Sequence, residues 1–387
     1  MTRQHRPEVV SDETRTHPAA REVATPTDLR EVLATRAPLR GVRIQDLDLH
    51  PFEGLLLART ELDGLVILGG RLSDRLATHL RLHGALVFPT DPGVPINPYR
   101  ATLYQAGDLY EDLTARGYAA TPDARAYEWS QDKRTHRDTF ATLLRAIHDD
   151  SMTDALTEQL AGRQAVGVMG GHALQRGTPE YADAATLGHA LADAGLVVIT
   201  GGGPGAMEAA NLGAFAGSSD RLAQALDRLA TVPSFRPSID DWAQVAMQTR
   251  TDLREEKLRD GTTGIRSVGI PTWFYGHEPP NVFCGGIAKY FSNAVREDAL
   301  LSRSTAGLVV LPGAAGTVQE IFQAVTPLYY AGVGVPVPPL ILVDSEHWTR
   351  TIPVVPALEA LGAQRELGSS THLVDDVAEA AELILAR

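Results

Sequence analysis

Short apolar runs that lead into a glycine-bearing turn and then a helical segment recur along the chain, and this alternation limits the folds open to it. The run at 196–200 has no charged residue, which is typical of a strand covered on both faces of a parallel sheet. Predicted helices alternate with similar runs at 165–169, 267–271, 307–310 and 339–343. We therefore predict an α/β fold, a Rossmann-like doubly wound parallel sheet that binds ligands at the carboxyl ends of its strands.

A smaller α/β region is predicted ahead of this sheet. Apolar runs at 41–44, 65–68 and 85–89 predict strands, and residues 72–83 predict a helix that Gly84 can end. The helical segment at 122–161 follows, with a predicted break near residues 149–151.

The chain has 387 residues, enough for two or three domains at about 150 residues each. Residues 1–25 are polar and without periodicity, so we predict a disordered tail. We predict an additional N-terminal α/β region at 26–150, with a regulatory or oligomerising role. A second domain, which contains the larger predicted sheet, is predicted at 151–387.

Composition narrows the range of partners. A formal charge of −13 argues against a nucleic-acid-binding protein, which needs a basic face. No apolar run reaches the ~18 residues that would cross a bilayer, so no membrane partner is expected. The single cysteine, Cys284, excludes an intrachain disulfide and a multi-cysteine metal site, as suits a reducing cytoplasm. We expect Cys284 to be a small buried residue, and we expect neither a metal nor a cofactor.

The stretch 311–320 joins an apolar run to a helix through a glycine-bearing turn. Backbone N–H groups at a helix start lack intrahelical partners, and the helix dipole adds about half a positive charge there. Gly313 and Gly316 would let the backbone turn and approach a phosphate, and Thr317 adds a hydroxyl. Glu320 falls on the first turn, either as a catalytic group or as an ordinary acid that complements the dipole.

A second glycine-rich turn, 201–206, fits a loose dinucleotide fingerprint. That fingerprint needs an acid about 20 residues further on, at the end of the next strand. Asp220 has the distance but sits in a predicted helix cap, so a nicotinamide enzyme is disfavoured. The Gly-Lys-Ser/Thr of a triphosphate-binding loop is absent. Two such turns in one sheet better suit one mononucleotide.

A long helix predicted at 285–304 would supply cationic groups. Lys289, Asn293 and Arg296 are spaced at i, i+4 and i+7 and would share one face of that helix. Arg296 could bind a phosphate through two nitrogens or hold a carboxylate in place, and a solvated face is the alternative. No lysine has a context that suggests a pyridoxal Schiff base.

The motifs at 201–211 and 312–320, about a hundred residues apart, resemble those of the LOG ("lonely guy") family. This family comprises Rossmann-like nucleoside 5′-monophosphate phosphoribohydrolases, often mislabelled lysine decarboxylases. The resemblance covers about residues 163 to 345. With its N-terminal region, the chain looks more similar to the larger bacterial nucleotide 5′-monophosphate nucleosidases than to the short cytokinin-activating enzymes. The resemblance implies a homodimer or larger homo-oligomer.

The resemblance also implies roles for individual residues. The catalytic carboxylate would be Glu320, and Arg296 would complete the catalytic site. The substrate-binding residues would be Gly170, Gly171, Gly201, Gly202, Gly203, Gly205, Pro312, Gly313, Gly316 and Thr317.

Three features depart from the family pattern. Ala314 replaces the second glycine of the usual Pro-Gly-Gly, so position 314 needs no glycine-only conformation. The offset of Arg296 from Pro312 is shifted by about one residue from the family's usual offset. His172 stands where the family often has a small or hydroxylic residue.

Two functions follow as hypotheses. The first is hydrolysis of the N-glycosidic bond of a nucleoside monophosphate, giving free base and ribose 5-phosphate. An ionised Glu320, with an ordinary pKa near ~4.3, would stabilise the oxocarbenium-like sugar, and Glu208 or Asp298 could assist. The second is a non-catalytic carrier or sensor on the same fold, resembling molybdenum-cofactor carrier proteins. Retention of both Glu320 and Arg296 favours the enzyme.

Overall fold

The computed structural model describes residues 21–259, 264–274, 278–332, 335 and 337–386. Contacts divide the chain into two compact units between Pro92 and Gly93, whereas the sequence placed the division after residue 150. The helical segment that follows residue 93 therefore belongs to the larger unit. The two units are described separately below.

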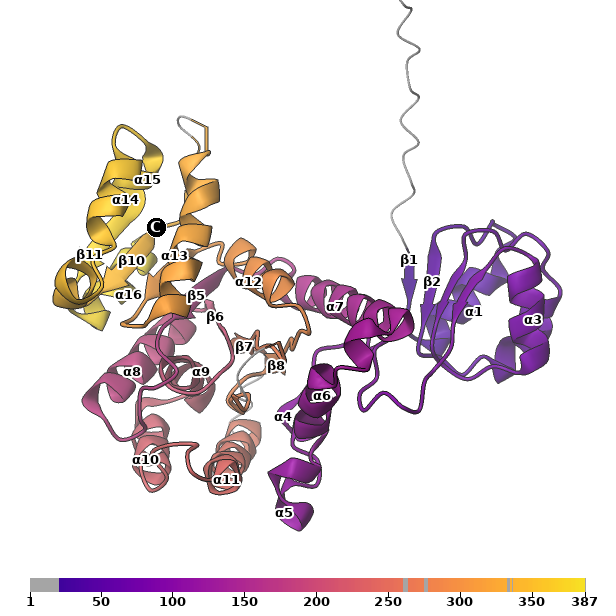
Figure 1. Ribbon diagram of the computed structural model, residues 1–387, viewed down its shortest axis with the longest axis horizontal. Helices are drawn as coiled ribbons and strands as arrows, with labels where there is room; N and C mark the ends of the chain where they lie inside the picture. The colour runs from indigo at the N-terminus through magenta and orange to yellow at the C-terminus, as the bar shows by residue number, and fades with distance from the viewer. Residues whose placement is uncertain (1–20, 260–263, 275–277, 333–334, 336, 387) are drawn as a thin grey trace, which may run out of the picture. The chain divides into compact units, whose positions relative to one another are not determined.

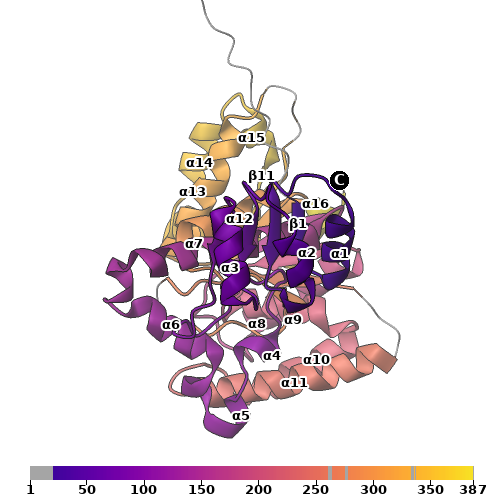
Figure 2. The same ribbon diagram turned by 90° about the vertical axis from the view of Figure 1, so that its right-hand side faces the viewer.

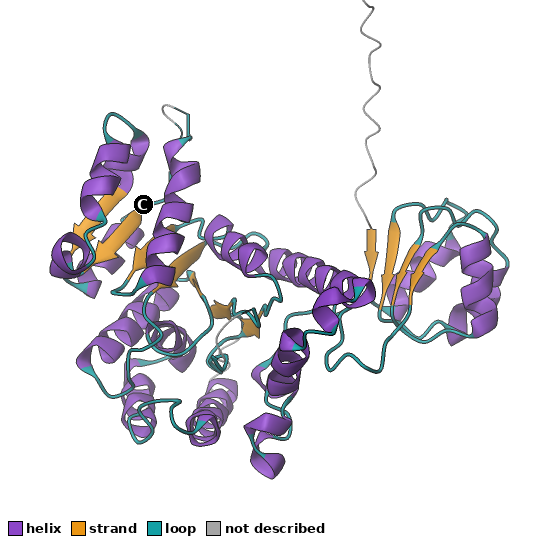
Figure 3. Ribbon diagram, viewed as in Figure 1, coloured by secondary structure: helices purple, strands orange, loops and turns teal. Residues whose placement is uncertain are grey.

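The smaller unit is built on a four-stranded parallel sheet in the order β1-β2-β3-β4, shown as orange arrows in Figure 3. Strands and helices alternate with a spacing of just over twenty residues, so each strand pairs with the next one in the chain. The elements are β1 (Arg21–Val23), α1 (Pro26–Ala34), β2 (Val42–Gln45), η1 (His50–Phe52), α2 (Glu53–Leu57), β3 (Val66–Leu68), α3 (Asp74–Leu82) and β4 (Leu86–Phe88).

The predicted strands and the predicted helix of this unit are all present. Gly84, with φ of +87°, ends α3 in the left-handed conformation that glycine adopts without strain. The predicted tail to residue 25 is wrong at its end: β1 pairs with β2, and Val23 is fully buried. A three-residue strand is too short to show a periodicity, which is why the sequence did not reveal it. Residues 1–20 lie outside the described residues.

The larger unit is built on a seven-stranded sheet, all of whose strand pairs are parallel, in the order β11-β10-β9-β5-β6-β7-β8. Every residue of β5, β6, β9 and β10 is buried, as the apolar runs predicted. The strands are β5 (Ala165–Met169), β6 (Val197–Thr200), β7 (Ser267–Gly269), β8 (Gly286–Ile287), β9 (Gly307–Val310), β10 (Leu340–Val343) and β11 (Thr371–Val374).

Helices cover both faces of this sheet, so the predicted doubly wound architecture is confirmed. In Figure 1, α8 and α9 lie on one side of the strands, and α12 and α13 lie on the other. In Figures 1 and 2, α10 and α11 pack together beside α9. These helices are α8 (Pro179–Asp193), α9 (Ala206–Ala216), α10 (Ser219–Leu229), α11 (Ile239–Arg259), α12 (Asn293–Ser302) and α13 (Ala315–Tyr329).

The remaining helices lie before the first strand of the large sheet and after β10. No helix in the described part of the chain combines the length and apolar character that a bilayer crossing requires. The remaining helices are α4 (Ala106–Leu109), α5 (Leu113–Arg116), η2 (Tyr118–Ala120), α6 (Pro122–Gln131), η3 (Thr135–Arg137), α7 (Thr139–Leu160), η4 (His347–Thr351), α14 (Val355–Gly362), α15 (Glu366–Ser370) and α16 (Val377–Leu385).

Two helix predictions are wrong. The break expected near 149–151 is absent, and α7 continues through these residues. The Asp149 carboxylate does not cap a helix there, because it accepts hydrogen bonds from the distant N–H groups of Phe291 and Ser292. The helix expected at 285–304 begins only at Asn293. The segment before it pairs with distant backbone instead: Ala288 N–H donates to the Gly269 carbonyl at 2.8 Å.

Candidate functional site

The strand order of the larger sheet reverses between β5 and β9, which are neighbours in space. The turns after these two strands meet there, since Gly171 N–H donates to the Pro312 carbonyl at 2.9 Å. A Cβ atom on Gly170 would lie 2.8 Å from the Ala206 side chain and 3.0 Å from that of Leu311. Only glycine allows this approach, and such a reversal point is where doubly wound sheets bind ligands.

The first turn of α13 opens into this place. Its N-cap, Ala314, supplies no side-chain hydrogen bond, so the N–H groups of the turn remain open to an anion. Ala314 has an ordinary extended φ of −119°, which explains why alanine is accepted there. Thr317 folds back over Gly313: a Cβ on Gly313 would lie 2.1 Å from the Thr317 hydroxyl oxygen. Glycine at 313 is needed for this close contact.

Gly316 has a different part from the one predicted. It lies inside the first turn of α13 rather than in a bend, and a Cβ there would meet nothing within 4 Å. Neither Gly313 nor Gly316 has a positive φ. The prediction of a sharp turn is therefore wrong for Gly316, whereas Gly313 lies in the strand-to-helix turn without a left-handed backbone. Both residues face the same cavity.

Arg296 of α12 and Glu320 of α13 form an ion pair between two helices that pack together. Arg296 Nη1 lies 2.7 Å from Glu320 Oε1, and their side chains are only 10% and 13% exposed. Arg296 Nε also donates to the Ile270 carbonyl at 2.9 Å, which fixes the guanidinium. Burial raises the pKa of the Glu320 carboxyl, and the charge and hydrogen bond of Arg296 offset part of that rise. The expectation of an ordinary pKa is thus wrong, because the site is drier than the sequence suggested.

The glycine-rich turn after β6 packs against this pair. A Cβ on Gly201 would lie 2.5 Å from Arg296 Nη2, so the guanidinium rests directly on the Gly201 backbone. Gly202 and Gly205 have φ of +70° and +73°, values that glycine alone adopts readily. These two residues shape the turn, while Gly201 and Gly203 face the cavity.

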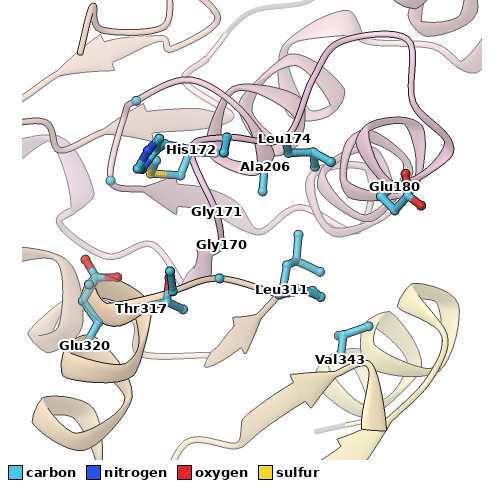
Figure 4. Close-up of a pocket in the computed structure, with 18 of the residues that line it drawn as sticks. Gly170, Gly171, His172, Leu174, Glu180, Ala206, Leu311, Thr317, Glu320 and Val343 are labelled. Carbon is cyan, nitrogen blue, oxygen red and sulfur yellow. The ribbon is translucent and has the colours of Figure 1, made fainter. Parts of the chain in front are cut away.

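These elements enclose a cavity of about 1020 Å³. In Figure 4, Glu320 and Thr317 project from α13 on one side of the cavity. On the other side lie His172, in the turn after β5, and Ala206, the first residue of α9. Ten of the twelve residues expected at the site line it, all except Gly202 and Gly205. The ten are Gly170, Gly171, Gly201, Gly203, Arg296, Pro312, Gly313, Gly316, Thr317 and Glu320.

The cavity also contains side chains that the sequence did not place there. Met207 and Glu278 lie near the glycine turn, since Cβ atoms on Gly201 and Gly203 would approach Met207 Sδ and Glu278 Oε2, at 2.8 and 3.5 Å. Residues from the far end of the sheet complete the lining, notably Asp344, His347, Asp375 and Asp376. Only the rule that strand carboxyl ends meet at one edge could have indicated this second group.

Lys289, expected on the same helix face as Arg296, lies elsewhere. It precedes α12, is buried, and pairs with Asp123 at 2.6 Å. Asn293 donates to Glu297 at 2.6 Å rather than facing the cavity. The shared cationic face therefore does not form.

The two acids proposed as assistants are also placed away from Glu320. Glu208 is buried and bound by both Arg176 and Tyr181, at 2.5 and 2.9 Å. Asp298 is exposed on α12 and does not line the cavity.

Cys284 is fully buried, and burial raises the pKa of its thiol to about 12, so it is not a nucleophile at neutral pH. Among the described residues, no group of three or more histidine, cysteine, aspartate or glutamate side chains is arranged to hold a metal ion.

Comparison with known proteins gives a partial assignment. A model of the SLOG cluster4 family, which is related to the LOG family, matches residues 163–219, the stretch from just before β5 to the start of α10. No curated protein matches the chain. Two solved structures that match are the molybdenum cofactor binding protein of Rippkaea orientalis and the molybdenum cofactor carrier protein of Chlamydomonas reinhardtii.

These two structures are 17% and 16% identical to the chain, and each match covers 58% of it. The matches cover 98% and 100% of the two proteins, with TM-scores of 0.35 and 0.34. The parallel sheet and the helices on both of its faces give the larger unit a Rossmann-like fold. Over residues 163–219 the chain has the sequence pattern of a SLOG family.

Proposed function

We propose that this protein hydrolyses the N-glycosidic bond of nucleoside 5′-monophosphates to give a free base and ribose 5-phosphate. The first turn of α13, with its uncapped N–H groups and the Thr317 hydroxyl, binds the 5′-phosphate. Pro312 and the glycines that face the cavity leave room for the phosphate and the ribose. Glu320 lies in the second turn of the same helix, not in its first turn as the sequence predicted, and it lines the cavity.

The state of the Glu320 carboxylate carries this proposal. Its Oε1 is bound by Arg296, while Oε2 accepts no hydrogen bond from any residue that the structure describes. Glu208, in contrast, has both oxygens bound, and its side chain is 1% exposed. A carboxylate held through one oxygen, with the other left in a ligand-sized cavity, can accept a proton from water or face a developing cation.

Cleavage of the bond leaves a sugar with oxocarbenium character, which a nearby carboxylate stabilises. Glu320 also accepts a proton from the water that attacks C1′. Its raised pKa makes it a stronger base than an ordinary glutamate, and Arg296 holds it in one orientation. Binding of the phosphate to α13 holds the ribose in the correct orientation for reaction. Less entropy is then lost on reaching the transition state.

Base release tests this function directly. The protein is incubated with AMP, GMP, CMP or UMP, and free base is measured by chromatography. We expect at least one free base from the wild type and a loss of about 10²-fold or more in Glu320→Gln, which keeps the shape but not the charge. Glu359→Gln, an exposed glutamate on α14, is the matched control and should leave turnover unchanged. Equal turnover of Glu320→Gln and wild type would contradict the assignment.

One observation favours a second function, a carrier of a phosphorylated cofactor such as the molybdenum cofactor. At about 1020 Å³ the cavity lies at the upper end of the usual range for small-molecule sites, so a larger ligand would fit. Binding of nucleotides or of a phosphorylated pterin, without release of any base, would support the carrier instead.

The resemblance to the LOG family also leads us to propose a homodimer or larger homo-oligomer. Light scattering of the full chain measures this directly, and a mass of one chain, 41.6 kDa, would contradict it.

A further inference from the structure

A histidine and a glutamate contact each other in the wall of the cavity. His172 Nδ1 lies 3.4 Å from Glu278 Oε1, and the two side chains are 54% and 33% exposed. His172 belongs to the turn after β5, and Glu278 to the segment between β7 and β8. Both residues line the same cavity as Glu320, and the function proposed above assigns neither of them a part.

The turn after β6 connects this pair to the Arg296–Glu320 pair. Arg296 rests against Gly201, and Glu278 approaches Gly203. The Cα atoms of Gly201 and Gly203 are separated by at most about 7 Å, the reach of two residues. The His172–Glu278 contact and the Arg296–Glu320 ion pair thus lie against opposite ends of one short turn.

The view of the cavity agrees with this placement. In Figure 4, His172 lies above Glu320 at one end of the cavity, with Thr317 next to Glu320, while Glu180 and Val343 lie at the other end. A ribose whose phosphate is bound at Thr317 and whose anomeric carbon faces Glu320 would direct its base toward this end.

Glycosidic cleavage needs a proton donor at this point. The base leaves with the electron pair of the C1′–N bond, and a proton delivered to a base nitrogen makes it a far better leaving group. Glu208 and Asp298 cannot deliver it, because one is locked in a buried ion pair and the other lies outside the cavity. Imidazole is the side chain used most often for such transfers near neutral pH.

We infer that His172 is the acid that protonates the departing base and that Glu278 positions its ring. The inference rests on the proposed nucleosidase function. The Nδ1 side of His172 is turned toward Glu278, which leaves Nε2 for the base. As the C1′–N bond breaks, its electron pair goes to the base nitrogen, which takes the proton from Nε2. Water bonds to C1′ and gives a proton to Glu320, and His172 regains a proton from solvent.

The test compares two leaving groups in the full-length protein. One is the nucleoside monophosphate that the wild type cleaves fastest, and the other is 4-nitrophenyl ribofuranoside 5-phosphate, whose nitrophenolate departs without a proton. We expect His172→Gln to lower kcat for the nucleotide by about 10²- to 10⁴-fold and to leave kcat for the nitrophenyl substrate within a fewfold of wild type. Glu278→Gln should give the same selective loss, but a smaller one.

A matched control exists in the other unit. His50 is also 54% exposed and lies 2.8 Å from a carboxylate, that of Asp48, so His50→Gln removes a comparable pair that does not line the cavity. It should change neither rate.

The outcomes separate the two claims. If the wild type releases no base, the proposed function fails and the inference fails with it. If the wild type is active but His172→Gln retains kcat, raises only KM, or slows both substrates equally, the proton-donor role alone is overturned.

Discussion

Replacing Arg296 should leave the buried Glu320 carboxylate without its cation. The resulting loss of folding stability can be worked out from the structure. In Arg296→Met, Glu320 loses its 2.7 Å partner and the Ile270 carbonyl loses a donor. The Arg296 and Glu320 side chains are 10% and 13% exposed, so solvent screens the pair little. Breaking such a pair costs about 3–5 kcal/mol, because an uncompensated charge stays buried. We expect the free energy of unfolding to fall by that amount at pH 7.

The double variant isolates the cause. Arg296→Met with Glu320→Met replaces both charges by apolar groups, and such replacements are usually neutral or stabilising. We expect the double variant to regain most of the loss while releasing no base. Urea unfolding followed by tryptophan fluorescence measures both values. If the single and double variants unfold at the same urea concentration, the ion pair is not the source of the loss.

The pH dependence of the same variant provides a second check. In the folded protein the pKa of Glu320 lies above its unfolded value of about 4.5, so the folded state binds more protons between those two values. Its contribution to stability is therefore most favourable at low pH and falls as pH rises through that window. Without Arg296 the folded pKa rises further and the window widens. The deficit of Arg296→Met should thus be largest at neutral pH and shrink toward pH 4.5.

Three further experiments test other parts of the structure. Gly313→Ala places a Cβ 2.1 Å from the Thr317 hydroxyl and should weaken binding of ribose 5-phosphate at least tenfold by calorimetry, and unchanged affinity would show that this contact is not needed. Cys284, whose pKa is raised to about 12, should resist a disulfide reagent at pH 8 in the folded protein and react once the protein is unfolded in urea. Lys289→Met leaves Asp123 buried without its cation and should lower stability by about 3–5 kcal/mol, and adding Asp123→Asn should restore most of it.

The sequence was informative wherever a feature depends on neighbouring residues. The buried strands at β5, β6, β9 and β10 contain no charged residue, and each is followed by a glycine turn or a helix start. The resemblance of the turn motifs to the LOG family then implied that Gly170, Gly201 and Pro312 belong to one site, and all three line the cavity. Local motifs together with that resemblance predicted this wall of the site.

Features set by distant partners could not be predicted in this way. Lys289 follows a helical spacing with Arg296, yet its segment pairs with the strand-end backbone of Gly269 and its ammonium reaches Asp123, 166 residues earlier. The contact between His172 and Glu278 likewise joins two turns more than a hundred residues apart. Burial of Glu320, which changes its pKa, depends on the whole enclosure.

The contrast between two buried ion pairs bears most directly on function. Arg176 donates to both oxygens of Glu208, and Tyr181 also donates to Glu208. Arg176 donates as well to the carbonyls of Val232 and Trp242. The polar groups of this pair are therefore all hydrogen-bonded, and the pair stabilises the core. The Arg296–Glu320 pair has fewer partners and opens into a cavity. Because apolar side chains would stabilise the fold at least as well there, packing gives no reason for two charges at that wall. The proposed nucleosidase reaction, which needs a carboxylate beside a sugar, gives such a reason.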